Sequence, residues 1–80
     1  MIVVIVRAVD EARIAEALRA GLGLTLRGDR VTVFATSPLP ASAARAAATL
    51  TSFGHDVVFD APADRMSRAI RSAHAVEVWT

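Results

Sequence analysis

The chain of 80 residues contains no cysteine. A disulfide framework, a zinc–thiolate site, a thiol nucleophile and a persulfide carrier are therefore excluded. The two histidines, His55 and His74, are far apart in the sequence and have no cluster of ligand residues beside them, so no metal site is predicted. No glycine-rich turn follows a strand, which excludes a dinucleotide fingerprint and a P-loop. Because no base–nucleophile pair is evident either, we expect no enzyme activity and no cofactor.

Long apolar runs and an excess of charge are also missing. No run approaches the ~20 residues of a membrane-spanning helix. The apolar run 2–6 follows Met1 directly and lacks the basic leader of a secretory signal. Nine arginines against eight acidic residues leave a net charge of +1, which does not indicate a nucleic-acid-binding protein. We therefore expect a cytoplasmic protein that binds neither nucleic acid nor a membrane.

Apolar residues, in contrast, are abundant. They make up 54% of the chain, and the mean hydropathy is +0.44. A domain of this size buries only ~60% of the surface that its unfolded chain exposes. The surplus apolar surface is expected to face another protein chain, so we predict an oligomer or a subunit of a larger assembly.

Four short apolar runs alternate with three helical patterns, without a linker or a repeat between them. The predicted strands cover residues 2–6, 31–35, 56–59 and 75–79. The first is apolar throughout, as is typical of a strand covered on both faces, whereas Glu77 interrupts the last and places it nearer an edge. Strands that alternate with helices form right-handed βαβ units. The prediction is a single α/β domain over residues 1–80, a three-layer α/β/α sandwich around a four-stranded parallel sheet of undetermined strand order.

Each predicted helix has an apolar stripe that should face the sheet. The first helix runs from the N-cap Asp10 to Arg27, and the second and third begin near Pro40 and Pro62. The predicted inward residues of the first helix are Ile14, Leu18, Leu22 and Leu26, with Gly21 at the margin, where the missing side chain would let a strand approach. Those of the second are Ala43, Ala46, Ala47, Leu50 and Phe53. Those of the third are Met66, Ala69, Ile70 and Ala73.

Ligands of open α/β sheets bind beyond the carboxyl ends of the strands. Four polar residues follow the first two predicted strands, namely Arg7, Asp10, Thr36 and Ser37. Arg7 with Asp10 could hold an anion, although such residues more often cap a helix and pair locally. Thr36 and Ser37 could bind phosphate ahead of a helix N-terminus, although Ser-Pro more often opens a turn.

Two further features are candidates for contacts with a partner. Arg65, Arg68 and Arg71 share the outer side of the third helix, as a solvated face or as a docking surface for an acidic partner or ligand. Trp79 is the only tryptophan and could either cover the core or anchor an interface, where tryptophan is enriched.

Residues 16–34 resemble the DsrE/DsrF/DsrH family, whose members include the subunits of the TusBCD sulfur-relay complex. The segment reads EALRAGLGLTLRGDRVTVF, and family members pair a first helix like ALxxALxLxxRG with a second strand like xVxVF. Residues 2–7 and 73–79 look similar to the family's first and last strand regions. The resemblance implies a DsrE-like fold and assembly into dimers, trimers or hexamers.

Family members that transfer sulfur carry a persulfide on a loop cysteine, which this chain lacks. Residues 36–40 stand where relatives often have a glycine-containing loop. The resemblance therefore implies a non-catalytic, homo-oligomeric scaffold subunit, associated with cysteine-bearing DsrE-like paralogues of the sulfur relay. The alternative is a small-ligand or anion-binding module that uses the four polar residues at the strand ends.

Overall fold

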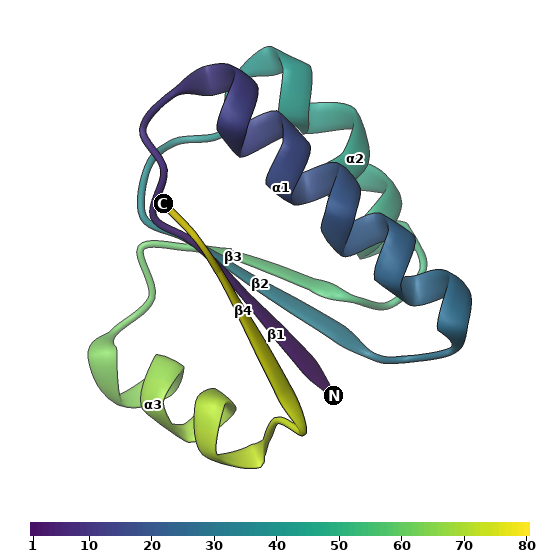
Figure 1. Cartoon of the computed structure of the whole chain (residues 1–80), viewed down its shortest axis with the longest axis vertical. Coiled ribbons are helices and arrows are strands. Elements are labelled where there is room, and N and C mark those ends of the chain that lie inside the picture. Colours follow the sequence, from purple (N-terminus) through teal and green to yellow (C-terminus); the bar gives the residue numbers. More distant parts are fainter.

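Four parallel strands form one sheet, with helices on both of its faces (Figure 1). The computed structural model describes all 80 residues. Its elements are β1 (Ile2–Val6), α1 (Glu11–Leu24), the short 3-10 helix η1 (Thr25–Arg27), β2 (Val31–Ala35), α2 (Ala41–Ser52), β3 (Asp56–Phe59), α3 (Ala63–Ser72) and β4 (Ala75–Trp79). The predicted three-layer α/β/α sandwich is confirmed.

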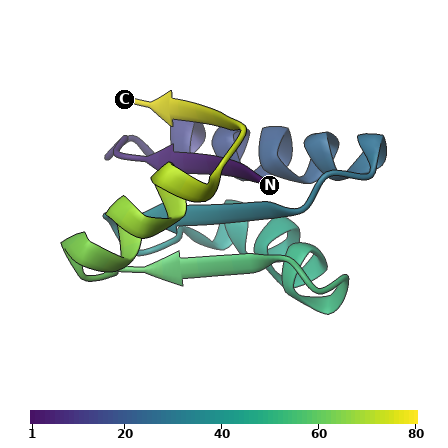
Figure 2. The same cartoon turned by 90° about the horizontal axis from the view of Figure 1, so that it is seen from below.

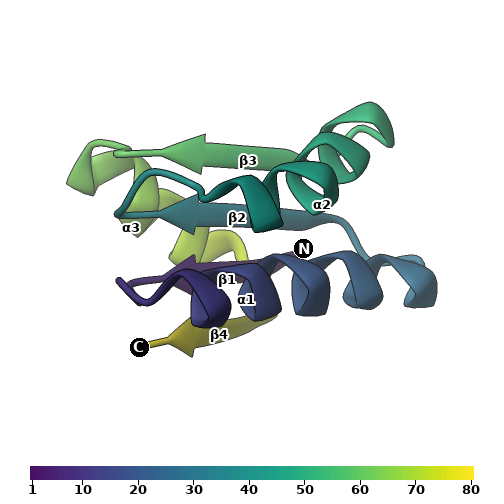
Figure 3. The same cartoon turned by 90° about the horizontal axis from the view of Figure 1, so that it is seen from above.

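The strand order, β3-β2-β1-β4, is what the sequence left open. From β1 the chain adds β2 and then β3 in one direction, and it then crosses back to place β4 on the other side of β1. The helix of this last crossover, α3, lies alone against one face of the sheet (Figure 2). Helices α1 and α2 lie side by side on the opposite face (Figure 3). The direction of winding thus reverses between β1 and β4, and in such sheets this switch point is where ligands bind.

The face beneath α1 and α2 holds the larger core. Val4 and Val33 from the central strands are fully buried there with Leu18 of α1 and Leu50 of α2. A Cβ atom added at Gly21 would lie 3.4 Å from a methyl group of Val33, so this glycine does allow the close approach that the sequence predicted.

The opposite face has a smaller core, because α3 is its only helix. Val3, Ile5 and Phe34 are buried there, and Met66 and Ala69 of α3 pack against them together with Ala73, which follows the helix. The coverage stops short of β4, the edge strand that Glu77 indicated. Val76 and Val78 consequently remain 41% and 54% exposed on this side.

Three predicted core positions are wrong. Leu26 is 89% exposed, because α1 ends at Leu24 and the tighter turn of η1 breaks the helical phase. Phe53 is 71% exposed, because α2 ends one residue before it. Ile70 is 38% exposed, since the part of the sheet that it faces has no second covering helix. None of the three α-helices is long and apolar enough to cross a membrane.

Candidate functional site

A hollow of about 320 Å³ opens on the α3 side of the sheet, near the carboxyl ends of β1 and β4. The residues that line it are Ile5, Arg7, Thr36, Met66, Ile70 and Val78. Two of the polar residues predicted at the strand ends, Arg7 and Thr36, therefore meet in one cavity. The cavity lies beside the switch point, where the topology of the sheet favours a ligand.

The floor and the wall of the hollow are apolar for separate reasons. Ile5 and Val78 are register partners on β1 and β4, so both side chains face α3. Met66 and Ile70 lie four residues apart on α3, which places them on the same face of that helix. The hollow is thus the space that α3 leaves over the junction of β1 with β4.

Arg7 supplies the only charged group among the lining residues. It follows β1 directly, and its backbone N–H donates to the Trp79 carbonyl oxygen at 2.8 Å. This hydrogen bond fixes the backbone position from which the Arg7 side chain extends. No carboxylate lies within 4.0 Å of its guanidinium, unlike those of Arg13, Arg30 and Arg68. A guanidinium carries five N–H donors in a planar fork, and here they are open to a ligand.

The hydroxyl of Thr36 is already engaged within the protein. It donates to the carbonyl oxygen of Val6 at 3.3 Å, and the backbone N–H of Thr36 donates to the same oxygen at 3.1 Å. These bonds hold the end of β2 against the end of β1. The hydroxyl oxygen keeps its acceptor capacity, but its proton is not free for an anion.

Asp10 and Ser37 do not line the hollow. The Asp10 carboxylate accepts the backbone N–H of Arg13 at 3.0 Å, so the predicted N-cap of the first helix is confirmed. Ser37 lies half-buried in the turn that leads to α2. The structure therefore divides the predicted group of four residues and brings only Arg7 and Thr36 together.

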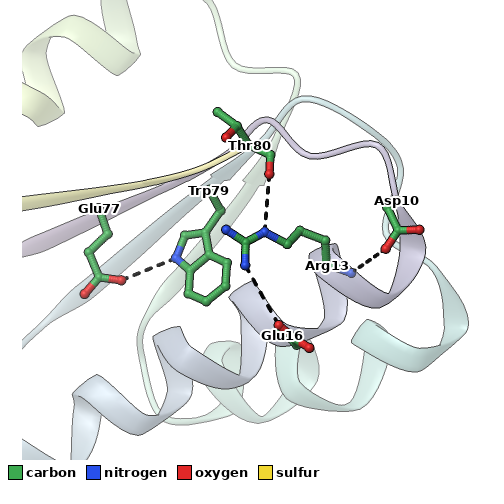
Figure 4. A network of polar contacts seen from close by, with 6 residues as sticks. All are labelled: Asp10, Arg13, Glu16, Glu77, Trp79 and Thr80. Atoms are coloured by element: carbon green, nitrogen blue, oxygen red, sulfur yellow. Dashed lines mark hydrogen bonds and ion pairs between the residues drawn. The ribbon is translucent and has the colours of Figure 1, made fainter.

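On the α1 side of the switch point, side chains of α1 and β4 form a network of contacts (Figure 4). The Arg13 guanidinium lies 4.5 Å from the centre of the Trp79 ring, and its Nε donates to the Thr80 carbonyl oxygen at 3.3 Å. The Trp79 indole N–H donates to Glu77 at 3.3 Å, and its ring packs against the larger core. In this chain Trp79 therefore covers the core beside β4.

The arginines of α3 are all exposed, as predicted. Arg68 lies 3.8 Å from Asp64, one turn earlier on the same helix. Arg65 and Arg71 form no ion pair. These side chains lie outside the hollow and contribute nothing to its lining.

The histidines directly precede β3 and β4. They therefore lie at the N-terminal ends of the strands, whereas the hollow lies near the carboxyl ends. His55 accepts the backbone N–H of Val31 at 3.1 Å, and His74 lies 3.5 Å from Asp29. No three histidine, aspartate or glutamate side chains gather closely enough to hold a metal ion.

A second hollow, of about 300 Å³, lies between α1 and α2. It is lined by Arg19, Leu22, Ser42, Arg45, Ala46 and Thr49. Neither arginine forms an ion pair, so this hollow is also electropositive. It lies between the two helices, away from the residues that line the first hollow.

Sequence reasoning missed the apolar half of the candidate site. Met66 and Ile70 have the spacing of ordinary core residues, and Val78 belongs to a strand that was placed near an edge without being linked to a site. The one available signal was Glu77, which placed the last strand at an edge and so implied incomplete cover.

Comparison of the chain with family models, with curated proteins and with solved structures finds no match in any of the three. The resemblance of residues 16–34 to the DsrE/DsrF/DsrH family stays a prediction. In the structure, the resembling segment forms most of α1, η1 and the strand β2, and its buried residues belong to α1 and β2.

Proposed function

We propose that this protein binds a small organic anion in the hollow between α3 and β4, without transforming it. The observation that carries the proposal is the unpaired Arg7 guanidinium, which lies in an otherwise largely apolar cavity beside the switch point. Ligand sites commonly combine apolar walls with a few polar groups that fix the orientation of the ligand. A volume of about 320 Å³ lies at the small end of the usual range for such sites.

Binding without catalysis follows from the residues that line the hollow. They include no histidine, carboxylate or thiol, and the one hydroxyl, that of Thr36, already donates to the backbone. General acid–base or nucleophilic catalysis needs a group that can move a proton or attack the substrate. An exposed arginine with apolar neighbours can hold and orient an anion, but it performs neither step.

The test is a thermal-shift and calorimetric screen of small anions against the purified chain. A binding anion is expected to raise the melting temperature in a saturable way, and Arg7→Ala is expected to reduce the shift markedly at the same anion concentration. The matched control is Arg45→Ala, which removes an exposed arginine from the second hollow and should leave the shift intact. No saturable effect across carboxylates, phosphates and sulfonates would contradict the proposal.

A second candidate function is a DsrE-like scaffold subunit that works in the cytoplasm. The observation that favours it is the uncovered apolar side of β4, where Val76 and Val78 lie exposed. In this role the chain would assemble with further copies of itself or with cysteine-bearing DsrE-like paralogues. Since it has no thiol, any persulfide would be carried by the partner.

The native mass of the protein captured gently from its host separates the two functions. Co-purification of a cysteine-bearing chain in a fixed ratio would support the scaffold role, and a monomer at micromolar concentration would oppose it. Val76→Ser sharpens the result, because Val76 belongs to the exposed side of β4 but does not line the hollow. This variant is expected to weaken assembly while leaving anion binding unchanged.

A further inference from the structure

Resting on the proposed function, we propose that the anion is a monocarboxylate with a short hydrocarbon chain. The carboxylate would bind the Arg7 guanidinium at the mouth of the hollow, and the chain would lie between α3 and β4. Three features of the site favour a monocarboxylate. They are the single positive charge of Arg7, the engagement of the Arg7 and Ala8 backbone N–H groups by Trp79, and the apolar side chains that line the rest of the hollow.

The charge of the site matches one negative charge. Arg7 is the only cation among the lining residues, and the Thr36 hydroxyl donates to Val6. A carboxylate satisfies a guanidinium fork through two parallel hydrogen bonds. A phosphate dianion would bring a second negative charge, and the hollow has no second cation to pair with it.

The backbone near the hollow does not form a phosphate cradle either. The N–H groups of Arg7 and Ala8 both donate to the Trp79 carbonyl oxygen, at 2.8 and 3.1 Å. At the N-terminus of α1, the Asp10 carboxylate already occupies the position that a phosphate group would take. These contacts engage the N–H groups of Arg7, Ala8 and Arg13 within the protein, whereas the side chain of Arg7 forms no ion pair.

The apolar walls match a hydrocarbon chain. Ile70 of α3 and Val78 of β4 are 38% and 54% exposed, and Ile5 and Met66 also line the hollow. A chain that lies along these side chains removes apolar surface from water on both partners. Complete burial of one methylene group strengthens binding by up to about fourfold, so a partly open groove should give about two- to threefold for each methylene added.

The experiment is isothermal titration of the whole chain with acetate, hexanoate, octanoate, 1-octanol and inorganic phosphate. Affinity is expected to rise from acetate to octanoate, and octanoate should bind at least tenfold more tightly than phosphate. Arg7→Ala is expected to weaken octanoate binding about tenfold, as for loss of a charged hydrogen bond. The same variant should change octanol binding by less than about twofold, because the alcohol has no charge to lose.

The outcomes distinguish this inference from the function on which it rests. If phosphate binds in an Arg7-dependent way and octanoate binds no better than acetate, the carboxylate inference is overturned while anion binding stands. If none of the anions binds saturably, both fail. If Arg45→Ala rather than Arg7→Ala removes octanoate binding, the ligand occupies the hollow between α1 and α2, and the inference is again overturned.

Discussion

Ile5 and Val78 are register partners on adjacent strands, yet Ile5 is 7% exposed and Val78 is 54% exposed. The difference arises because α3 lies over β1 and stops short of β4. A buried and an uncovered apolar side chain thus lie side by side on the same face of the sheet. The hollow forms because α3 covers β1 but not β4. The winding direction of the sheet reverses between these two strands, and Arg7 follows β1 at the same place.

Substitution of Val78 tests whether the uncovered strand β4 contacts the ligand. Val78→Ser is expected to weaken octanoate binding about threefold, because it removes part of one apolar wall. Because the residue is exposed, the free energy of unfolding should change by less than about 1 kcal/mol. Isothermal titration and urea denaturation measure the two quantities.

The matched control for this substitution is Val76→Ser, which alters the same strand and face outside the hollow. An equal loss of octanoate affinity in both variants would indicate a general effect on β4 and would count against contact between Val78 and the ligand.

The core beneath α1 is expected to depend strongly on Leu18. Leu18 is fully buried, so Leu18→Ala should lower the free energy of unfolding by about 2–5 kcal/mol through lost contacts and a cavity. Leu26→Ala is the same chemical change at a residue that is 89% exposed, and it should cost less than about 0.5 kcal/mol. Chemical denaturation checks both values, and similar losses in the two variants would show that the assigned helix phase is wrong.

Two glycines of the first helical region should respond to alanine with opposite signs. Gly23 lies exposed near the end of α1 with nothing within 4 Å of an added Cβ atom, so Gly23→Ala should stabilise the protein by about 0.5–1 kcal/mol. Gly28 has a φ of +83°, where a Cβ atom is strained, so Gly28→Ala should destabilise it by about 1 kcal/mol. Melting curves of the two variants give the signs directly, and a gain in stability on Gly28→Ala would contradict the turn described for this residue.

The stacking of Arg13 on Trp79, on the α1 side of the sheet, can be tested by fluorescence spectroscopy. Trp79 is the only tryptophan, so the tryptophan fluorescence of the protein reports on the surroundings of this one ring, to which Arg13 contributes. Arg13→Ala is expected to expose the ring, shift its emission to longer wavelength and cost about 0.5–1 kcal/mol of stability. Arg19→Ala, a control on the same helix, should leave the emission unchanged. An unchanged spectrum in the Arg13 variant would contradict the stacking.

The layers of the fold could be predicted from local patterns, whereas the site could not. The uniformly apolar run 2–6 indicated a strand with helices on both faces, and Asp10 marked the start of the first helix. Leu26 and Phe53 were misassigned because a helical period says nothing about where the helix ends. The hollow forms because β4 lies beside β1. Local sequence patterns do not predict this pairing, since the two strands are at opposite ends of the chain. Arg7 was recognised as a candidate, but its apolar surroundings on α3 and β4 were not.

Amide NMR spectra of the labelled protein, recorded during titration with octanoate, test the central claim most directly. The claim predicts saturable shifts that are largest at the lining residues Ile5, Arg7, Thr36, Met66, Ile70 and Val78. Arg7→Ala should reduce these shifts at equal octanoate concentration. Shifts that centre on Arg19 and Arg45, or a spectrum that does not change, would contradict the assignment of the ligand site to the hollow between α3 and β4.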